Sequence, residues 1–533
     1  MNTRQDILDQ LSSKTYDVVV IGGGIVGAGI AREAAMQGLS TLLLEKRDFG
    51  WGTSSRSSKL VHGGLRYLEQ MHFHLVFEAL AERTDLLRMA PVDALPFLFP
   101  TYKGDRVPFW LLEMGMFCYD ALALFRAPKM HRFHTKKSAL KLAPKMRADG
   151  LIAASEYYDA KTDDCRLVME TLRSARRYGA DALNYAEVTE LGIRQKSIDR
   201  IAVRDNESGK TYTASGRIVI NAAGPWMEKV IKLFKSDHPR VIRASKGAHL
   251  FVRRREGDSD RAVVLSDSKT KRILFYVPWK PGINLVGTTD TDYTGDFDNV
   301  DADKNDVAYI RENFDHYFPN ALSPDDIISS NAGLRPLIFE SGKDERTTSR
   351  EHRVIVHEPY NFISIGGGKL TTYRVMARQA VDTALRTLAK RGTPLSRVPM
   401  DRNAPIISKN PFDGAAGLDA SSRFAMEYFG YADLALRIHA LAAGDKSLTA
   451  SIGDPRISRA MIKYFVDEEM AMSLEDVMDR RLRFSLTETD GGMKAATAVA
   501  GEMGKLLGWN SARKAKEITR YKMIVTRNRA ALR

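Results

Sequence analysis

Strand-like apolar runs and helix-like segments alternate along the N-terminal part of the chain. Residues 18–21 form an unbroken β-branched run, a glycine-rich turn follows, residues 25–37 predict a helix, and residues 42–44 form a second apolar run. An unbroken apolar run is typical of a parallel strand buried on both faces. Similar strand-to-helix segments return at residues 217–226 and 362–383. The pattern therefore predicts a Rossmann-like α/β sheet that other segments interrupt.

The interrupting segments have a different pattern. Strands separated by Gly, Pro and charged turns are predicted at residues 241–252, 262–265, 273–279 and 283–289. Strands joined in this way form an antiparallel sheet, so we expect an α+β domain woven into the first one. We expect the first domain to cover residues 1–399, with the inserted domain at about residues 91–150 and 240–350.

The character of the chain changes again after about residue 400. Residues 457–472 and 474–484 carry apolar side chains at steps of three and four, which is the period of an amphipathic helix. Ser473 is placed to cap the second of these helices, with Asp476 completing a capping-box-like pair. We predict an all-helical domain at residues 400–533 that ends in the basic run 513–533.

The turn after the first strand carries the first candidate chemistry. Gly22, Gly24 and Gly27 fit G-x-G-x-x-G, and Glu45 follows the second strand. The glycines allow the turn, close approach of a pyrophosphate, and close packing of the helix on the strand. Glu45 is placed to accept hydrogen bonds from a ribose, and its charge disfavours a 2′-phosphate, so FAD or NAD is favoured over NADP.

Composition limits the class of protein. The 533 residues are 44% hydrophobic, long enough for two or three domains, and the formal charge is +14. Such a charge suits an anionic substrate, an anionic membrane surface or nucleic acid. Two cysteines without C-x-x-C spacing indicate a reducing compartment, and residues 1–15 lack the apolar core of a secretory signal, so we expect a cytoplasmic protein. Residues 107–125 are broken by Glu113, Gly115 and Asp120, so no transmembrane helix is predicted.

Three further segments carry candidate cofactor contacts. Residues 53–67 combine hydroxyl donors, cations and paired glycines, residues 218–226 are a strand entering a small-residue turn, and residues 362–373 are a strand, a glycine turn and a helix start. A helix start aimed at a flavin would stabilise the negative charge of the reduced ring, which favours flavin over nicotinamide. For residues 53–67 an ordinary Ser-rich connection remains an alternative. The residues expected to contact the cofactor are Thr53, Ser54, Ser58, His62, Ala223, Gly224, Gly368 and Thr372.

Taken in order, these motifs resemble one family. The stretches IGGGIVGAGIA, TSSRSSKLVHGGLRYLE, INAAGPW, KGAHL, VGTTDTDY, GLRPL and GGGKLTTYR, with the helical stretch 461–484, are similar to the aerobic, quinone-linked, FAD-dependent glycerol-3-phosphate dehydrogenase family. The resemblance covers nearly the whole chain, and only the first motif is shared widely among flavin oxidoreductases. It implies FAD as cofactor and oxidation of sn-glycerol 3-phosphate to dihydroxyacetone phosphate, with hydride passing to flavin N5.

The resemblance also implies roles for particular residues. A phosphate dianion needs fixed cations, and Arg335, Arg66 and Lys369 each lie in a small-residue turn. We assign Arg335 chiefly to phosphate, and Arg66, Tyr67 and Lys369 to the substrate oxygens or phosphate. His249 is the leading candidate for the proton acceptor, because histidine titrates near neutral pH, although it could instead brace the fold.

The acidic run 290–301 approaches the spacing of a calcium loop. It lacks the terminal glutamate, has Thr294 at a ligand position and follows a predicted strand, so we expect no metal there.

The resemblance points to a membrane quinone as electron acceptor. Residues 109–125, with basic residues on both sides, could lie in an anionic bilayer interface at the inner face of the cytoplasmic membrane, or could be a buried helix with a solvated basic flank. The basic C-terminal run is a second candidate for docking.

Several alternatives stay open. A glycerol-3-phosphate oxidase would share the donor half-reaction and use oxygen. An amine oxidase is disfavoured, because the predicted cations would repel an amine. A basic FAD-containing binding protein is a further alternative, but no aromatic platform interleaves the basic residues, so we expect no nucleic acid partner. The oligomeric state, a homodimer included, is not determined by the sequence.

Overall fold

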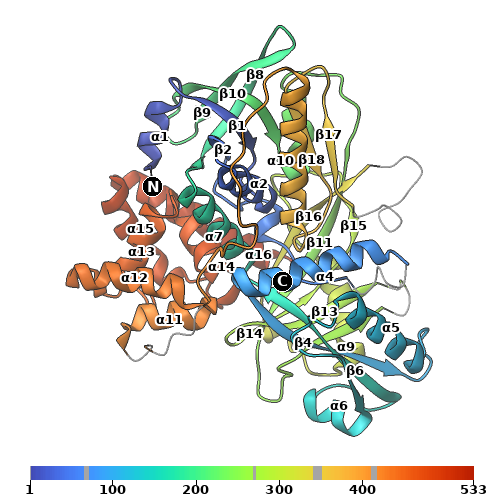
Figure 1. Ribbon diagram of the computed structural model, residues 1–533. Coiled ribbons are helices and arrows are strands. Elements are labelled where there is room, and N and C mark those ends of the chain that lie inside the picture. The colour runs from blue at the N-terminus through green and yellow to red at the C-terminus, as the bar shows by residue number, and fades with distance from the viewer. Residues whose placement is uncertain are drawn as a thin grey trace.

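The computed structural model describes the chain except for residues 1, 65–70, 268–269, 271, 340–350, 410–413 and 415–416. Two sheets and a group of C-terminal helices make up the molecule (Figure 1).

The first sheet contains the predicted parallel strands. β1 (Thr15–Ile21) pairs in parallel with β2 (Thr41–Leu44) and with β10 (Thr211–Asn221), and β10 pairs in parallel with β18 (Phe362–Gly366). The remaining strands are the parallel strand β7 (Asp181–Leu183), the antiparallel strand β17 (Arg353–Val356), and the hairpin of β8 (Ala186–Arg194) and β9 (Ser197–Asp205). The run from Val18 to Val20 is fully buried, which explains why it shows no polar alternation.

Three helices pack together over this sheet (Figure 1): α2 (Ile25–Met36), α7 (Asp164–Arg177) and α10 (Tyr373–Lys390). Because α2 directly follows β1, its N-terminus lies at the carboxyl ends of the parallel strands. Ligands of open α/β sheets bind at this edge.

The second sheet is largely antiparallel, as predicted. Its strands are β3 (Leu60–Val61), β4 (Val92–Tyr102), β5 (Arg132–Thr135), β6 (Leu151–Thr162), β11 (Ile242–Arg253), β12 (Ala262–Ser266), β13 (Ile273–Lys280), β14 (Ile283–Gly287), β15 (Thr291–Asp292) and β16 (Ile327–Ile338). β6 extends this sheet past residue 150, beyond the first predicted insertion.

Side chains alternate between the two faces of the second sheet. Val263 and Leu265 pack with α9 (Lys304–Tyr317) on one face, whereas Val264 packs on the other face with α4 (Phe73–Met89) and α5 (Phe109–Leu122). The short helices α1 (Arg4–Gln10) and α6 (Lys136–Leu142) lie at the periphery of the two sheets, and α8 (Met227–Ile231) packs against β10.

The C-terminal region is helical, as predicted. It comprises α11 (Ala420–Phe429), α12 (Ala432–Gly444), α13 (Arg459–Asp467), α14 (Phe484–Thr487), α15 (Met493–Leu507) and α16 (Ser511–Ala530). Ser473 and Asp476 form the predicted reciprocal pair, in which each backbone N–H donates to the other side chain. The following segment, Asp476–Arg481, is a π-helical turn and not the predicted regular α-helix.

Buried ion pairs join the C-terminal helices to the first sheet. Asp48, which follows β2, contacts the guanidinium groups of both Arg480 and Arg481. Burial alone would raise the pKa of Asp48, but the two arginines outweigh it and lower that pKa. These two consecutive side chains reach one carboxylate from within the π turn.

In the described part of the chain, every helix is either too short or too polar to cross a bilayer.

Candidate functional site

Two adjoining cavities lie between the sheets. One, of about 290 Å³, is at the carboxyl ends of β1, β2 and β10, and the other, of about 280 Å³, lies against the second sheet. Thr53, Ser54, Gly368 and Lys369 line both cavities. The two spaces therefore form one elongated site that runs from the carboxyl ends of the first sheet to the second sheet.

The predicted glycine turn forms a cradle at the first cavity. Gly22 has a φ of +115°, a conformation that L side chains rarely adopt, and it lines the cavity together with Gly24. A Cβ on Gly27 would lie 1.8 Å from the carbonyl oxygen of Gly22, so Gly27 is required for close packing of helix on turn. Ala223 and Gly224 line the same cavity.

Glu45 lies at the end of β2 as predicted. Its carboxylate accepts the backbone N–H groups of Gly23 at 2.7 Å and Arg47 at 2.9 Å. These bonds fix the carboxylate at the rim of the cavity, where a ribose would meet it.

The segment from residue 53 to 62 is tied into the site at several points. Thr53 donates to the carbonyl of Leu334 at 2.6 Å, and the Ser54 hydroxyl accepts the N–H of Ile25 at 3.0 Å. The backbone of His62 exchanges two hydrogen bonds with the hydroxyl of Thr371. These contacts are inconsistent with an ordinary solvated connection, the alternative left open by the sequence.

His249 on β11 is buried at the wall of the second cavity. Its imidazole Nε2 lies 2.9 Å from the Ser58 hydroxyl oxygen. Gly287, its cross-strand partner on β14, leaves room for the ring, since a Cβ there would come within 2.7 Å of it. Burial lowers the pKa of His249 well below 6.5, and the positive charges of Lys59 and Arg335 add to this effect. The ring is therefore neutral near pH 7.

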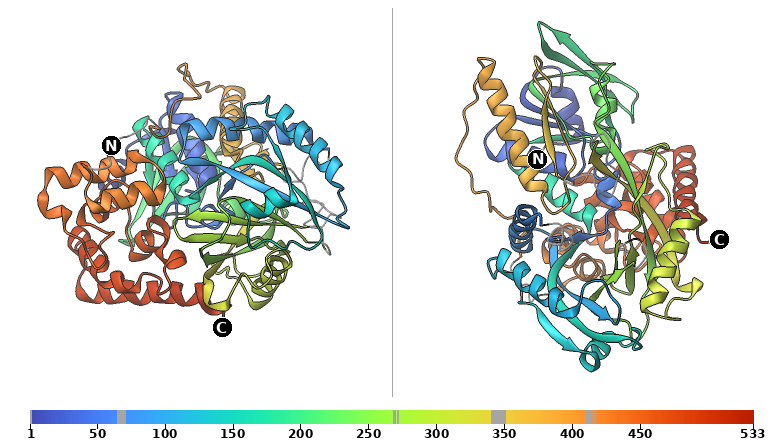
Figure 2. Two further views of the ribbon diagram at one scale, coloured as in Figure 1. Left: turned by 90° about the horizontal axis from the view of Figure 1, so that it is seen from below. Right: turned by 90° about the vertical axis from the view of Figure 1, so that its right-hand side faces the viewer.

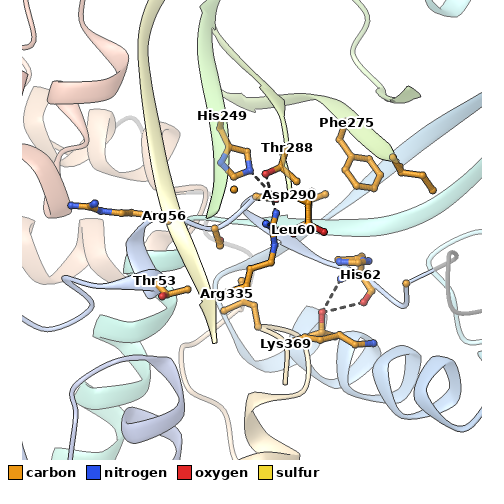
Figure 3. A pocket seen from close by; sticks show the side chains of 18 of the residues that line it. Thr53, Arg56, Leu60, His62, His249, Phe275, Thr288, Asp290, Arg335 and Lys369 are labelled. Carbon is orange, nitrogen blue, oxygen red and sulfur yellow. Dashed lines mark hydrogen bonds and ion pairs between the residues drawn. The ribbon is translucent and has the colours of Figure 1, made fainter. Parts of the chain in front are cut away.

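Arg335 on β16 contacts Thr288 and Asp290. One guanidinium nitrogen donates to the Thr288 hydroxyl at 3.0 Å, and another lies 3.2 Å from the carboxylate of Asp290. Figure 3 shows Arg335 with His249 and Thr288 on one side and His62 and Lys369 on the other. Gly247 on the neighbouring strand makes room for the guanidinium, because a Cβ there would lie 2.5 Å from it.

The predictions for Thr372, for Arg66 and Tyr67, and for the acidic run 290–301 have different outcomes. Thr372 is buried at the start of α10, and the residue that lines the cavity at this point is Thr371. Arg66 and Tyr67 lie outside the described residues. Asp290, weighed above as part of a calcium loop, instead contacts Arg335 and the Ser245 hydroxyl. The described residues contain no cluster of three or more His, Cys, Asp or Glu side chains suited to a metal.

Sequence reasoning missed one wall of the second cavity. That wall is aromatic and apolar, formed by Leu60, Phe97, Phe99, Tyr157 and Phe275. Its one available signal was the alternation of Phe97 and Phe99 along a strand.

The residues present fit FAD. The glycine cradle leaves room for a pyrophosphate at the N-terminus of α2. Glu45 is held where the ribose of a bound FAD would lie. The second cavity adjoins the first and would receive the flavin ring. These features are the ones that the dinucleotide fingerprint requires.

The chain matches two family models, the FAD dependent oxidoreductase model over residues 17–382 and the C-terminal domain of alpha-glycerophosphate oxidase over residues 427–514. It is 37% identical to glycerol-3-phosphate dehydrogenase 2 of Mycobacterium tuberculosis, over 96% of this chain and 88% of that protein. It is 34% identical to the aerobic glycerol-3-phosphate dehydrogenase of Staphylococcus haemolyticus, over 95% and 93% of the two chains.

A solved structure agrees with these matches. The glycerol-3-phosphate dehydrogenase from Bacillus halodurans, complexed with FAD, superposes with a TM-score of 0.80 at 28% identity and covers 99% of this chain and 98% of its own. The predicted fold class and the predicted cofactor, FAD, are confirmed. With the glycine cradle, the adjoining cavities and both family models in agreement, the chain belongs to the FAD-dependent glycerol-3-phosphate dehydrogenase family.

Proposed function

We propose that this protein oxidises sn-glycerol 3-phosphate to dihydroxyacetone phosphate and passes the electrons to a membrane quinone. The observation that carries the proposal is the convergence of Arg335, Lys369 and His249 on one cavity beside the FAD cradle. Two cations suit a phosphate dianion, and a buried neutral imidazole suits the removal of an alcohol proton. The names of the relatives support the choice of donor.

Arg335 is the principal phosphate ligand in this proposal. Its guanidinium is oriented by Thr288 and Asp290, so little conformational freedom is lost when a phosphate binds. Lys369, at the junction of the two cavities, adds charge. The assignment of Arg66 and Tyr67 to the donor rests on the family resemblance alone.

The protein's own groups then position the donor and remove its hydroxyl proton, with His249 as the proton acceptor. When bound, FAD supplies the two-electron acceptor for the hydride that leaves the carbon bearing the secondary alcohol. The apolar wall at Phe97 and Phe275 keeps water from this end of the cavity.

The proposed docking surface for the membrane is α5 and the segment that follows it. Trp110, Met114 and Phe117 on α5 are 68%, 54% and 54% exposed, which argues against the alternative of a wholly buried helix. Exposed basic residues follow at Arg126, Lys129, Arg132, Lys136 and Lys137. This combination suits an anionic bilayer interface.

The C-terminal helix fits this role less well. Figure 2 shows the end of α16 on the opposite side of the molecule from α4 and α5, so one flat membrane cannot engage both. Arg527 and Arg529 of α16 also bind groups of the protein itself, Asp301 and backbone carbonyls. We therefore favour α5.

An anaerobic titration tests the donor. Glycerol 3-phosphate should bleach the yellow protein to completion, and glycerol should bleach it far more slowly. A flavin that stays oxidised under excess glycerol 3-phosphate would contradict the proposal.

Oxidase activity is the second candidate, favoured by the match to the C-terminal domain of alpha-glycerophosphate oxidase. With the same donor, reduction of a soluble quinone analogue should greatly exceed oxygen consumption. Rapid peroxide formation with little quinone reduction would favour the oxidase.

A further inference from the structure

The imidazole of His249 has a single polar contact in the described part of the chain. Its Nε2 lies 2.9 Å from Oγ of Ser58, whereas its Nδ1 is buried with no hydrogen-bond partner. The residue as a whole is 2% exposed. A proton that the ring takes up from the cavity therefore arrives at Nε2, where Ser58 lies.

Ser58 is more accessible than the ring. It is half-buried and lines the same cavity as Arg335 and Lys369. A serine hydroxyl donates one hydrogen bond while accepting others, so Ser58 can face the donor's hydroxyl and the ring at the same time.

We propose that Ser58 is a catalytic proton relay between the secondary hydroxyl of the donor and His249. The proposal rests on the proposed function and adds a residue to it. As hydride leaves the carbon, Oγ of Ser58 accepts the proton of the donor's hydroxyl, and the original Ser58 proton passes to Nε2 of His249. The donor's C–H and O–H bonds break and a C=O bond forms; His249 becomes an imidazolium that later releases its proton to solvent.

The neighbours of Ser58 are fixed by one carboxylate. Oδ2 of Asp164 accepts the N–H and the hydroxyl of Ser57 at 3.0 and 2.7 Å and the ammonium of Lys59 at 2.7 Å. The other oxygen of Asp164 is bound by Arg483 from the C-terminal region. Both residues that flank Ser58 are thus held, which keeps its Oγ within proton-transfer distance of the ring.

A set of loop variants tests the relay by stopped-flow bleaching under anaerobic conditions. Ser58→Ala should slow flavin reduction by glycerol 3-phosphate by roughly a hundredfold, which is typical of lost acid–base catalysis, with little change in donor affinity. Ser58→Thr, which keeps a hydroxyl, should recover most of the rate. Ser55→Ala is the matched control, because among the described residues that hydroxyl contacts only the backbone carbonyls of Trp51 and Gly52.

The double variant distinguishes a chain of two residues from two separate roles. If the proton passes through both groups, Ser58→Ala/His249→Gln should be no slower than the slower single variant. If the rate reductions of the two single variants multiply in the double variant, the relay is wrong. Failure of the wild type to bleach would count against the proposed function, whereas normal bleaching by Ser58→Ala would count against the relay alone.

The protonation state of the ring gives a readout that is independent of turnover. In protein labelled with ¹⁵N-histidine, the His249 signal, identified by its loss in His249→Gln, should show Nε2 without a proton and accepting a hydrogen bond. This signal should move in Ser58→Ala. An Nε2 that carries the proton in the resting wild type would rule the relay out.

Discussion

Arg335, the proposed phosphate ligand, is also one partner of an ion pair. The carboxylate of Asp290 lies 3.2 Å from its guanidinium, and both side chains are mostly buried. Removing one partner of such a pair leaves the other charge uncompensated, so the two residues cannot be judged separately. The pairing also lets the site keep a cation in place before an anionic donor arrives.

Arg335→Ala should therefore weaken binding of the donor much more than it slows the chemical step. We expect the KM for glycerol 3-phosphate to rise roughly a hundredfold, in line with about 3 kcal/mol for charge-assisted hydrogen bonds. The measurement is steady-state kinetics with a dye acceptor, comparing glycerol 3-phosphate with glycerol. Arg243→Ala is the control, because Arg243 on β11 pairs with Asp292 and does not line either cavity. Retention of a strong preference for the phosphorylated donor would show that Arg335 has another role.

A second residue makes the stability depend on pH. Burial, with the nearby charges of His238 and Lys235, lowers the pKa of His357 to about 4, and its Nε2 lies 2.9 Å from the Ser364 hydroxyl. Above pH 6.5 such a histidine is mostly neutral in both the folded and the unfolded protein. On acidification the unfolded protein takes up the proton first, because its histidine has the higher pKa. Stability should thus fall between pH 6.5 and pH 4.

Urea unfolding from pH 7.5 to pH 4 measures this effect. Between pH 6.5 and pH 4, the free energy of unfolding of His357→Asn should fall by on the order of 2 kcal/mol less than that of wild type, with solvent screening allowed for. If the free energy of unfolding depends on pH in the same way in both proteins, His357 does not contribute to the pH dependence.

Helix α5 illustrates how one element can serve two environments. Leu112, Met116 and Tyr119 pack inward against the second sheet, while Trp110 and Phe117 project outward. Its inner face supports the apolar wall of the second cavity, and its outer face is the proposed docking surface. The element thus lies between the flavin site and the proposed membrane.

Substitution of the outer face tests that role. Serine at Trp110, Met114 and Phe117 together should reduce binding to anionic phospholipid vesicles by at least tenfold, because each side chain gives about 1.5–3 kcal/mol when buried in the interface. Dye-linked activity in solution should stay unchanged. Met523→Ser on α16, which removes a side chain that is 62% exposed, should have no effect. Loss of vesicle binding in Met523→Ser alone would assign docking to the C-terminal helix.

Periodicity predicted the elements well where it was strong. The strands at 242–253 and 273–280 lie within one or two residues of their predicted bounds, because both alternate or remain apolar between clear turns. The π turn at Asp476–Arg481 was not predicted, and its contact with Asp48 is too distant along the chain for local spacing to reveal.

The whole molecule depends on charges buried between its parts. Asp48 binds Arg480 and Arg481, and Arg483 binds Asp163 and Asp164, all with almost no exposure. Such networks cost desolvation when they form, and breaking one partner is strongly destabilising. We expect these pairs to fix the position of the C-terminal helices on the first sheet.

Asp48→Asn should therefore lower the free energy of unfolding by about 3–5 kcal/mol. Chemical denaturation followed by circular dichroism and flavin fluorescence would measure the loss. The control is Arg200→Met, which removes the exposed pair with Glu190 and should change stability by less than about 1 kcal/mol. Equal losses in the two variants would contradict a structural role for the buried network.

The site was predictable in its parts but not in its contacts. Gly22, Glu45, His249, Arg335 and Lys369 were identified because glycine turns and ionisable residues in motifs leave a local signature. The pairing of Ser58 with His249 joins residues that are 191 positions apart, and that of Arg335 with Asp290 joins residues 45 apart. No local spacing encodes such contacts, and the roles of these residues, like the domain boundaries, remain predictions.

The short distance along the chain between Glu45 and Asp48 has one more consequence. The first is held at the ribose rim and the second anchors the C-terminal helices, with only two residues between them. If flavin binding and attachment of the C-terminal helices are coupled through this segment, thermodynamic reciprocity requires that each change the equilibrium constant of the other by the same factor. Removal of the flavin would then weaken the attachment of the C-terminal helices, and detachment of those helices would weaken flavin binding by the same factor.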